Sequence, residues 1–328
     1  MIAGPIAPAR SLEESIRAQG FGLGFDLVGI TTLGSVETAP HFDAWLERGY
    51  AGEMHYLPKW ADKRRDSRLP HEGVTSAIVV ALDYGGKEPA GPVARYARGN
   101  DYHDVLSAKL RELHTWIAFE LGHEVRGRAY VDTGPLLERD LARRAGLGWF
   151  GKNTNLIHPK LGSFFFLGAL LLELDLAPDA PFESDHCGTC TRCIEACPTD
   201  AIVEPRVLDA TRCISYLTIE AKGEVPLELR EQIGELIYGC DICQDVCPWN
   251  EKFARTLPEG SPFAARELIA GKSARTLATE ILAMSQEEFS RAFRNSPMKR
   301  AKLAGLKRNA MVVLSNGDDT VIPRAPRV

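Results

Sequence analysis

The stretch that decides the fold is Cys187-Gly-Thr-Cys190-Thr-Arg-Cys193-Ile-Glu-Ala-Cys197-Pro198, in which the cysteines are separated by two, two and three residues. A second run, Cys240-Asp-Ile-Cys243-Gln-Asp-Val-Cys247-Pro248, repeats the last three of these positions together with the proline. The eighth cysteine, Cys213, lies between the two runs, 27 positions before Cys240. All eight cysteines of the 328-residue chain therefore fall within residues 187–247.

This spacing is typical of bacterial ferredoxin domains with two [4Fe–4S] clusters, in which the fourth cysteine of each run ligates the other cluster. It predicts one cluster on Cys187, Cys190, Cys193 and Cys247, and a second on Cys197, Cys240, Cys243 and Cys213, the only cysteine left. Disulfides are disfavoured in a chain expected to be cytosolic. Structural zinc also uses four cysteines but rarely shows this spacing. Two clusters conduct electrons, so the remainder of the chain must hold the site that receives them.

The N-terminus and the composition predict a soluble, cytosolic protein. Ser11-Leu-Glu-Glu14 has the form of a helix capping box, and the helix that it opens is expected to end near Gly20. This start does not resemble a signal peptide. The longest apolar run, residues 164–172, is much shorter than the roughly 20 residues that span a membrane, so we expect a buried strand and no membrane contact.

Charge is unevenly distributed along the chain. Residues 291–328 contain nine Lys and Arg against two Asp and Glu, a net of +7, while the whole chain carries −5 and the first 290 residues therefore carry −12. A basic C-terminal segment on an acidic body suits contact with a polyanion. Charge alone leaves a solvated helical surface as the alternative.

Strands and helices are expected to alternate in the N-terminal two-thirds. Strand patterns occur at residues 26–30, 77–82, 129–132 and 163–174, and helical patterns at 101–121 and 135–145, which predicts an α/β or α+β domain. Residues 146–151 match G-x-G-x-x-G, but that fingerprint needs a strand before it and a helix after it. Here a helix precedes it and a polar loop follows, so we reject a nicotinamide site. A glycine-rich turn beside a large flat ligand stays open.

Two polar residues at the ends of elements are candidates for chemistry. Asp132 is either a functional carboxylate at a ligand-binding sheet edge or the cap of a helix expected to begin at Pro135. A helix N-terminus stabilises an ionised carboxylate, whereas a proton donor needs a raised pKa. Asp101-Tyr-His103 partly matches D-x-H-x-x-G, a motif whose His ligates cobalt in some cobalamin enzymes, but Leu106 replaces the glycine. His103 is therefore expected to be a polar residue at a helix N-terminus.

Four further stretches resemble the epoxyqueuosine reductase family. They are Gly52-Glu-Met-His-Tyr-Leu57, Ala94-Arg-Tyr-Ala97 with Asp101-Tyr-His103, Val131-Asp-Thr-Gly-Pro135 through Gly148-Trp-Phe-Gly-Lys152, and Cys213-Ile-Ser-Tyr-Leu217. Tyr238-Gly-Cys-Asp-Ile-Cys243 and Asp245-Val-Cys-Pro-Trp-Asn250 complete the resemblance, which spans roughly residues 10–320.

The resemblance implies that epoxyqueuosine at the wobble position of tRNA is reduced to queuosine with loss of water. It implies an N-terminal α/β (α+β) domain that holds cobalamin and substrate over residues 1–178. A ferredoxin-type domain with an insertion and two [4Fe–4S] clusters would follow at 179–255, and a basic, helical, HEAT-like segment at 256–328. Cobalamin would be bound base-off, with no side chain below the cobalt, which agrees with the imperfect D-x-H-x-x-G match.

The resemblance also implies roles for individual residues. The family's proton donor falls on Asp132. Its cobalamin contacts fall on His55, Arg95, Asp132, Ile157, His158, Ser163 and Ser215. Contacts with tRNA are expected from Lys222, Arg291, Arg294, Lys299, Arg300, Lys302, Lys307 and Arg308.

Two rival functions stay open from the sequence. A reductive dehalogenase shares a cobalamin-plus-ferredoxin layout, but such proteins commonly carry a twin-arginine export signal, which is not seen here. A ferredoxin-type electron-transfer protein would bind neither cobalamin nor tRNA tightly. We further expect an external flavodoxin- or ferredoxin-like electron donor and a monomer. Trp149, Phe150 and Trp249 either line the pocket or fill the core.

Overall fold

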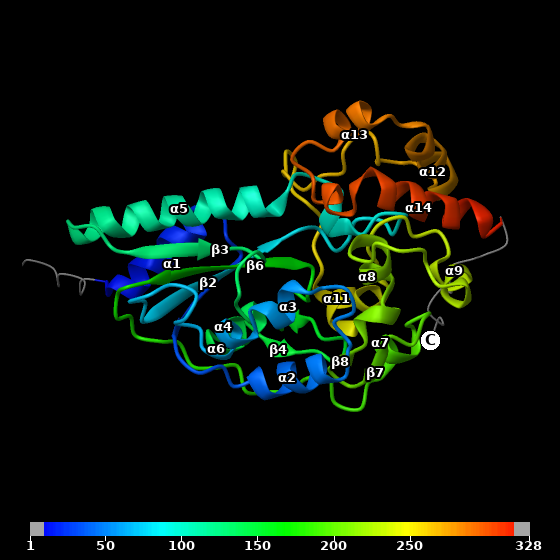
Figure 1. Cartoon of the computed structure of the whole chain (residues 1–328). Helices are drawn as coiled ribbons and strands as arrows, with labels where there is room; N and C mark the ends of the chain where they lie inside the picture. Colours follow the sequence, from blue (N-terminus) through cyan, green and yellow to red (C-terminus); the bar gives the residue numbers. More distant parts are fainter. Residues whose placement is uncertain (1–9, 318–328) are drawn as a thin grey trace, which may run out of the picture.

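The computed structural model describes residues 10–317, and its centre is a four-stranded sheet (Figure 1). The strands are β1 (Leu27–Thr32), β2 (Ser76–Asp83), β3 (Gly127–Tyr130) and β6 (Phe165–Leu172), in the order β1-β2-β6-β3. Each matches a strand expected from the sequence. Every neighbouring pair is antiparallel, so the domain is of the α+β kind.

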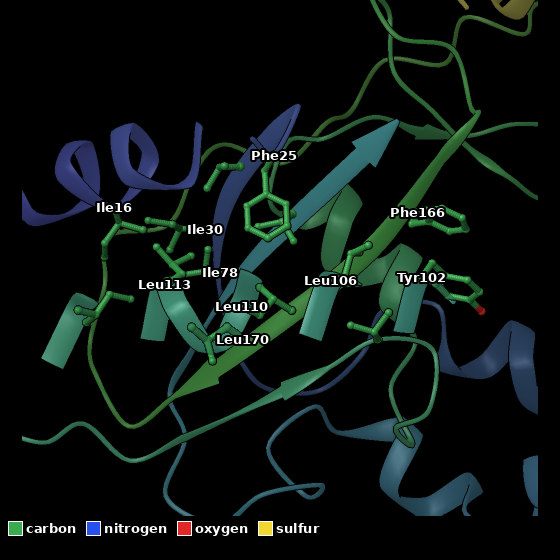
Figure 2. Close-up of a cluster of buried hydrophobic side chains, with 14 of the residues drawn as sticks. Ile16, Phe25, Ile30, Ile78, Tyr102, Leu106, Leu110, Leu113, Phe166 and Leu170 are labelled. Atoms are coloured by element: carbon green, nitrogen blue, oxygen red, sulfur yellow. The ribbon is translucent and has the colours of Figure 1, made fainter. Parts of the chain in front are cut away.

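Helices cover both faces of this sheet because its central strands are apolar on both sides. Ile78 and Val80 of β2 face the cluster that contains α1 (Leu12–Gly22) and α5 (Tyr102–Leu121), and Figure 2 shows Leu106, Leu110 and Leu113 against the sheet. The alternate residues of β2 face α6 (Glu138–Arg144). Gly168 of β6 lets α5 pack closely, since a Cβ there would lie 3.0 Å from Leu110.

Local signals set the start of α1 and both ends of α5, but they mislead at α6, next to the site. The capping box of Ser11 and Glu14 opens α1 as predicted, and Asp101 caps α5, which ends at a left-handed Gly122. The predicted start at Pro135 is wrong, because α6 begins at Glu138. Residues 131–136 form a loop instead, and the reading of Asp132 as a helix cap is therefore also wrong.

Short elements connect the sheet to the cysteine-rich segment. They are α2 (Ala39–Glu47), α3 (Tyr56–Lys59), α4 (Ala61–Arg65), η1 (Arg95–Ala97), and the hairpin of β4 (Trp149–Phe150) and β5 (Leu156–Ile157). The hairpin uses the glycine-rich residues 146–151. Gly148 has φ 151°, and a Cβ there would lie 2.2 Å from the carbonyl oxygen of Ile157, so the motif serves a tight turn after a helix.

The cysteine-rich segment consists of short helices and one small hairpin. Its elements are α7 (Arg192–Glu195), β7 (Ile202–Glu204), β8 (Val207–Leu208), η2 (Ala210–Arg212), α8 (Ile214–Ile219), α9 (Leu227–Ile233), α10 (Ile242–Asp245) and α11 (Pro248–Phe253). With little regular structure of its own, this segment is expected to depend on its ligands and its neighbours for stability.

A C-terminal helical unit packs against the middle of the chain. It comprises α12 (Ala274–Ala283), α13 (Gln286–Ala292), η3 (Pro297–Ala301) and α14 (Lys302–Ser315). Its core includes Val93 and Tyr238, which pair in a parallel bridge, and the Tyr238 hydroxyl donates to the carbonyl of Pro297 at 2.7 Å. Within the described residues, no helix has the length and apolar character needed to cross a membrane.

Candidate functional site

The first set of cysteines lines a cavity of about 160 Å³. Cys187 and Cys190 precede α7, Cys193 lies on it, and Cys247 arrives immediately before α11. Burial, together with the charges of Cys187, Cys247 and Cys190, raises the pKa of the Cys193 thiol to about 11. These four thiols are therefore neighbours, as the spacing predicts.

The second set is brought together by the insertion between the two runs. Burial raises the pKa of the Cys243 thiol well above its ordinary value, and the charges of Cys240, Cys213 and Cys197 raise it further. Cys213 reaches this group because it ends η2 and begins α8. Cys193 of the first set also acts on Cys243, though least of all, so the two groups lie side by side.

Both groups suit iron–sulfur clusters in charge and surroundings. Burial and neighbouring negative charge both favour the protonated thiol at Cys193 and Cys243, while the positive charge of cluster iron would favour their ionised forms. The backbone N–H of Ala201 points at the Sγ of Cys197 at 3.3 Å, the kind of contact that tunes cluster potentials. Across residues 10–317, no three His, Cys, Asp or Glu side chains converge on a single metal ion; the first set surrounds a cavity instead.

Aromatic rings shield the first set. Trp249 lines its cavity, and the Trp149 ring lies 5.0 Å from that of Trp249 at 76°. Lys152 fixes the cysteine loop by donating to the carbonyls of Gly188 and Cys190 at 2.7 and 2.9 Å. The tryptophans that the sequence could not assign therefore enclose a cluster site.

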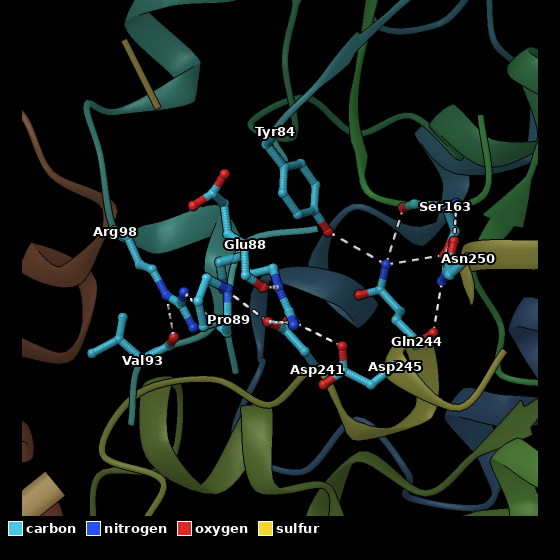
Figure 3. A network of polar contacts seen from close by, with 11 residues as sticks. Tyr84, Glu88, Pro89, Val93, Arg98, Ser163, Asp241, Gln244, Asp245 and Asn250 are labelled. Carbon is cyan, nitrogen blue, oxygen red and sulfur yellow. Dashed lines mark hydrogen bonds and ion pairs between the residues drawn. The ribbon is translucent and has the colours of Figure 1, made fainter. Parts of the chain in front are cut away.

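A buried ion pair joins the N-terminal domain to the second set (Figure 3). Nη1 of Arg95 lies 3.0 Å from Asp241 and 2.7 Å from Asp245, and its Nε donates to the carbonyl of Glu88 at 2.6 Å. The side chains of Arg95 and Asp241 are only 6% and 8% exposed. Because Asp241 follows Cys240 directly, this pair fixes a loop that carries cluster ligands.

A second buried network continues from this pair to the sheet. Gln244 donates to the hydroxyl and the carbonyl of Ser163 at 3.1 and 3.0 Å, and Asn250 donates to the same hydroxyl at 2.9 Å. Figure 3 shows Tyr84, at the end of β2, reaching the same Gln244. Ser163 and Arg95, both predicted cobalamin contacts, are thus engaged by protein partners.

Asp132 stands out among the loop residues that follow the sheet. Its side chain is 69% exposed, and its backbone is left-handed, with φ 56°. The Tyr102 hydroxyl donates to its Oδ2 at 2.7 Å, and its own backbone N–H donates to Glu138 at 2.7 Å. Burial and the charge of Asp132 raise the pKa of both neighbours, so Tyr102 stays a hydrogen-bond donor.

Three of the resembling stretches converge beside Asp132. The Tyr216 hydroxyl accepts a hydrogen bond from the backbone N–H of Glu53 at 2.7 Å, and a Cβ on Gly52 would lie 2.3 Å from that hydroxyl oxygen. Tyr56 follows in α3, and the Arg300 guanidinium lies over its ring at 5.5 Å. The charges of Arg300 and Asp132 both act on the Tyr56 hydroxyl, so η3 borders the Asp132 site.

The other predicted cofactor contacts differ in their surroundings. His55 is exposed at the start of α3, and Ser215 is half-buried in α8. Ile157 is buried against the first cysteine set. His158 is half-buried, and burial, with Lys160 and Arg255, lowers the pKa of its imidazole to about 4, so it is neutral at neutral pH.

Two family models match separate parts of the chain. Residues 64–133 match epoxyqueuosine reductase QueG, DUF1730, and residues 186–250 match a 4Fe-4S double cluster binding domain. An epoxyqueuosine reductase of Leadbetterella byssophila is 44% identical over 93% of this chain and 99% of its own length. That of Escherichia coli is 40% identical over 95% of this chain and 83% of its own.

The chain belongs to the epoxyqueuosine reductase family.

Solved structures of this family have the same fold. An epoxyqueuosine reductase with an epoxyqueuosine-modified tRNA-Tyr stem loop superimposes with a TM-score of 0.81 at 31% identity, over 93% of this chain and 81% of that one. The Bacillus subtilis epoxyqueuosine reductase, in a form whose aspartate-bearing catalytic loop is swung out of the active site, gives 0.80 at 31% identity with the same coverage. The mixed α/β architecture and the 4Fe-4S domain are thereby confirmed.

The basic residues expected to meet tRNA fall into two kinds in this family member. Most have exposed side chains, as at Arg291, Arg294, Lys299 and Lys302. Lys222 is exposed too, while Lys307 is half-buried. Arg308 differs, because its guanidinium donates to the carbonyls of Leu217, Ala221 and Gly223. Its hydrogen bonds hold the segment after α8 against α14. Because its guanidinium is already hydrogen-bonded within the protein, Arg308 is no longer expected to contact phosphate.

Sequence reasoning missed the surroundings of Asp132 in the epoxyqueuosine reductase fold. Glu138 was not singled out, and Tyr102 was quoted only as part of a resembling stretch. His103 was assigned to a helix N-terminus, where it indeed lies, but its Nε2 is 4.0 Å from Oδ2 of Asp132. The one signal in the sequence is that residues 101–103 and 131–135 both belong to stretches that resemble the same family.

Replacing Arg95 with Ala should destabilise the cluster-loaded protein by about 3–5 kcal/mol, because Asp241 and Asp245 would stay buried without their cation. Anaerobic thermal unfolding measures the loss. The matched control is Arg68→Ala, since Arg68 is 57% exposed in its pair with Asp66 and solvent screening should leave its effect on stability small. Equal unfolding midpoints for the two variants would contradict the structural role of the buried pair.

Proposed function

We propose that this chain reduces epoxyqueuosine to queuosine in tRNA. The observation that supports this most is that a member of this family has two adjacent four-cysteine groups and an exposed Asp132 in the loop after β3. Reduction of the epoxide to an alkene consumes two electrons and two protons and releases the ring oxygen as water. Two clusters conduct electrons singly, and Asp132 is the proton donor that the resemblance implies.

We also propose that cobalamin is the group at which the electrons arrive. When bound, it supplies a cobalt centre that accepts single electrons and passes reducing equivalents to carbon. The surroundings of Asp132 suit such a large ligand, because the rings of Tyr56, Tyr96 and Tyr102 lie near this carboxylate. Base-off binding fits as well, since Asp101 holds Nδ1 of His103 at 2.6 Å and the opposite ring nitrogen is directed at Asp132.

The predicted cofactor contacts separate into two roles in this proposal. Exposed His55, half-buried Ser215 and the rim residue Asp132 are free to touch the ligand. Ile157 and His158 offer an apolar and a neutral polar surface. Arg95 and Ser163 act instead through their backbone positions and by holding the cluster segment, because their side chains are already hydrogen-bonded inside the protein.

The basic residues of η3 and α14 are proposed to hold the tRNA. Lys299 and Lys302 are exposed beside Arg300, which borders the Asp132 site through Tyr56. Phosphate contacts there would position the anticodon loop while the wobble base leaves its stack and reaches Asp132. We propose that residues 256–328 form a HEAT-like unit, because the helices α12, α13 and α14 follow one another there. The bounds at residues 1 and 328, with Arg324 and Arg327 of the basic count, lie outside the described residues.

The remaining assignments follow from this function. Residues 1–178 would hold cobalamin and substrate, and residues 179–255 the two clusters. Enzymes that modify tRNA work where tRNA is, so we propose a cytoplasmic location. The clusters must also be reduced from outside, and we propose a flavodoxin- or ferredoxin-like donor for this. A monomer is the simplest state, because the cysteines of one chain suffice for both clusters.

The decisive measurement is anaerobic turnover of tRNA that bears epoxyqueuosine, with clusters and cobalamin reconstituted and a strong reductant present. The digested nucleosides should lose the mass of one oxygen atom, and only when cobalamin is included. Asp132→Asn should lower this rate by about 100-fold or more, as loss of a general acid does. The control is Asp200→Asn, which has a similar exposed, left-handed position with φ 48°. An unchanged base with all cofactors bound would contradict the reaction.

Cluster stoichiometry tests the cysteine assignment. Cys213→Ala should remove the second cluster and lower bound iron to about half of the wild-type content, because a cluster of this type needs four ligands. Cys193→Ala should remove the first cluster and have the same effect on iron. Anaerobic iron analysis with electron paramagnetic resonance of the reduced protein distinguishes the two variants. Full iron content in Cys213→Ala would show that the insertion does not supply a ligand.

Salt dependence tests the tRNA surface. The logarithm of the tRNA association constant should fall linearly with the logarithm of salt concentration, and Lys299→Gln with Lys302→Gln should reduce the slope by about one unit each. Arg126→Gln is the control, because Arg126 pairs with Glu173 at the start of β3, whereas Asp132 follows the other end of that strand. A slope that stays the same in the lysine variants would rule out phosphate contacts at η3 and α14.

A further inference from the structure

Three residues form a line that ends at the proposed proton donor. Oδ1 of Asp101 lies 2.6 Å from Nδ1 of His103, and Nε2 of the same ring lies 4.0 Å from Oδ2 of Asp132. The His103 ring is also stacked on Tyr102, with centroids 4.0 Å apart. An imidazole held by a carboxylate on one nitrogen, with the other aimed at a second acid, is the arrangement of a proton relay.

The distance of 4.0 Å exceeds a direct hydrogen bond, but a small rotation of Asp132 would bring the two groups into contact. Such a rotation is available, because the Asp132 side chain is 69% exposed while the His103 ring is 31% exposed. Oδ2 of Asp132 is the oxygen shared with the Tyr102 hydroxyl. Within residues 10–317, Oδ1 has no hydrogen-bond partner, so it remains available to a substrate.

The stoichiometry of the proposed reaction requires such a supply. Opening the epoxide breaks one C–O bond, and the alkoxide oxygen takes one proton. Breaking the second C–O bond forms the alkene, and the departing oxygen takes the second proton to leave as water, while two electrons come from a low-potential one-electron reductant through the clusters. One carboxyl group carries only one proton, so it must be protonated again within a single turnover.

We propose that His103 returns a proton from solvent to Asp132 during each turnover, with Asp101 holding its ring. This inference rests on the proposed function. Asp101 is suited to its part because, although burial raises its pKa, the hydrogen bond and charge of His103 prevail and lower it. Asp101 is therefore an anion that holds Nδ1 of the ring at 2.6 Å. Both residues act through Asp132 and do not touch the reacting atoms.

The other groups near Asp132 are less suited to this task. Burial keeps Tyr102 protonated, so it donates a hydrogen bond but does not release its proton. Glu138 accepts a hydrogen bond from the backbone N–H of Asp132, so its carboxylate contacts the main chain of the loop and not the Asp132 carboxylate. The charged and titratable groups that act on this line from the surrounding elements are Tyr56 from α3, Tyr96 from η1, Glu138 and Arg139 from α6, Tyr238 and Arg266. Glu220, just after α8, and Arg300 lie beyond Tyr56 and act on its hydroxyl.

The test is His103→Gln, which keeps a polar side chain but cannot relay a proton near neutral pH. The kcat for epoxyqueuosine in tRNA should fall about 10- to 100-fold, part of the range for loss of acid–base catalysis, with KM unchanged. The loss should be smallest at about pH 5.5, where hydronium in the solvent is most abundant, and largest above about pH 7. Free imidazole should restore part of the rate, as it supplies the missing acid.

Two further variants separate a relay from a structural role. Asp101→Asn keeps the cap of α5, since Asn caps as well as Asp, but removes the charge, so it should show a smaller loss with the same pH trend. His123→Gln makes the same substitution at an exposed residue just beyond α5 and should leave the rate unchanged. Cobalamin absorbance, iron content and tRNA affinity should match the wild type in all three variants.

The outcomes are distinct. A wild-type protein that fails to convert epoxyqueuosine would overturn the proposed function, and the relay with it. An active wild type with a His103→Gln variant of equal kcat and pH profile would overturn the relay alone. So would a loss of rate that neither varies with pH nor responds to imidazole, because a ring that only packs against Tyr102 would give that result.

Discussion

Each four-thiol group takes one cysteine from the other run, and this exchange constrains the rest of the structure. Cys247 joins the set at residues 187–193, and Cys197 joins the set that contains Cys213, Cys240 and Cys243. Residues 187–247 are thereby closed into one unit whose short helices could not bury enough apolar surface alone. Four thiolates meet only when a cation offsets their repulsion, so cluster binding and folding of this segment are coupled.

The rest of the chain is attached to this unit through buried polar contacts. Arg95 links the loop after β2 to Asp241, and Asn250 and Gln244 link α10 and α11 to Ser163 before β6. Such contacts are directional, unlike apolar packing, and each leaves an uncompensated group if it slips. They therefore fix the distance between the clusters and the sheet edge that carries Asp132, a distance on which electron transfer depends. Two residues predicted to touch the cofactor act in this way.

Much of this arrangement was readable from the sequence, because its signals are local. Cysteine spacing predicts which four thiols are neighbours in each group, and capping residues mark the start of α1 and both ends of α5. The start of α6 was predicted too early, because Pro135 suits a first helical turn but the loop around Asp132 uses it instead. The pairing of the strands was not predictable, and neither were the hydrogen bonds of the Arg308 guanidinium to backbone carbonyls, since both depend on segments distant in sequence. The resemblance implies Asp132, whereas His103 comes to lie beside it only in the folded chain.

The backbone of Asp132 explains why its loop could not be derived from propensity. A left-handed conformation with φ 56° is unfavourable for most residues with a side chain, although Asp tolerates it better than most. Here the N–H of Asp132 is held by Glu138, and Gly134 packs so closely on the Tyr130 ring that a Cβ would lie 2.1 Å away. Strain of this kind persists only where the surroundings enforce it. Because of this turn, the carboxylate does not cap α6. It is exposed to solvent instead, and it lies beside Tyr102 and His103.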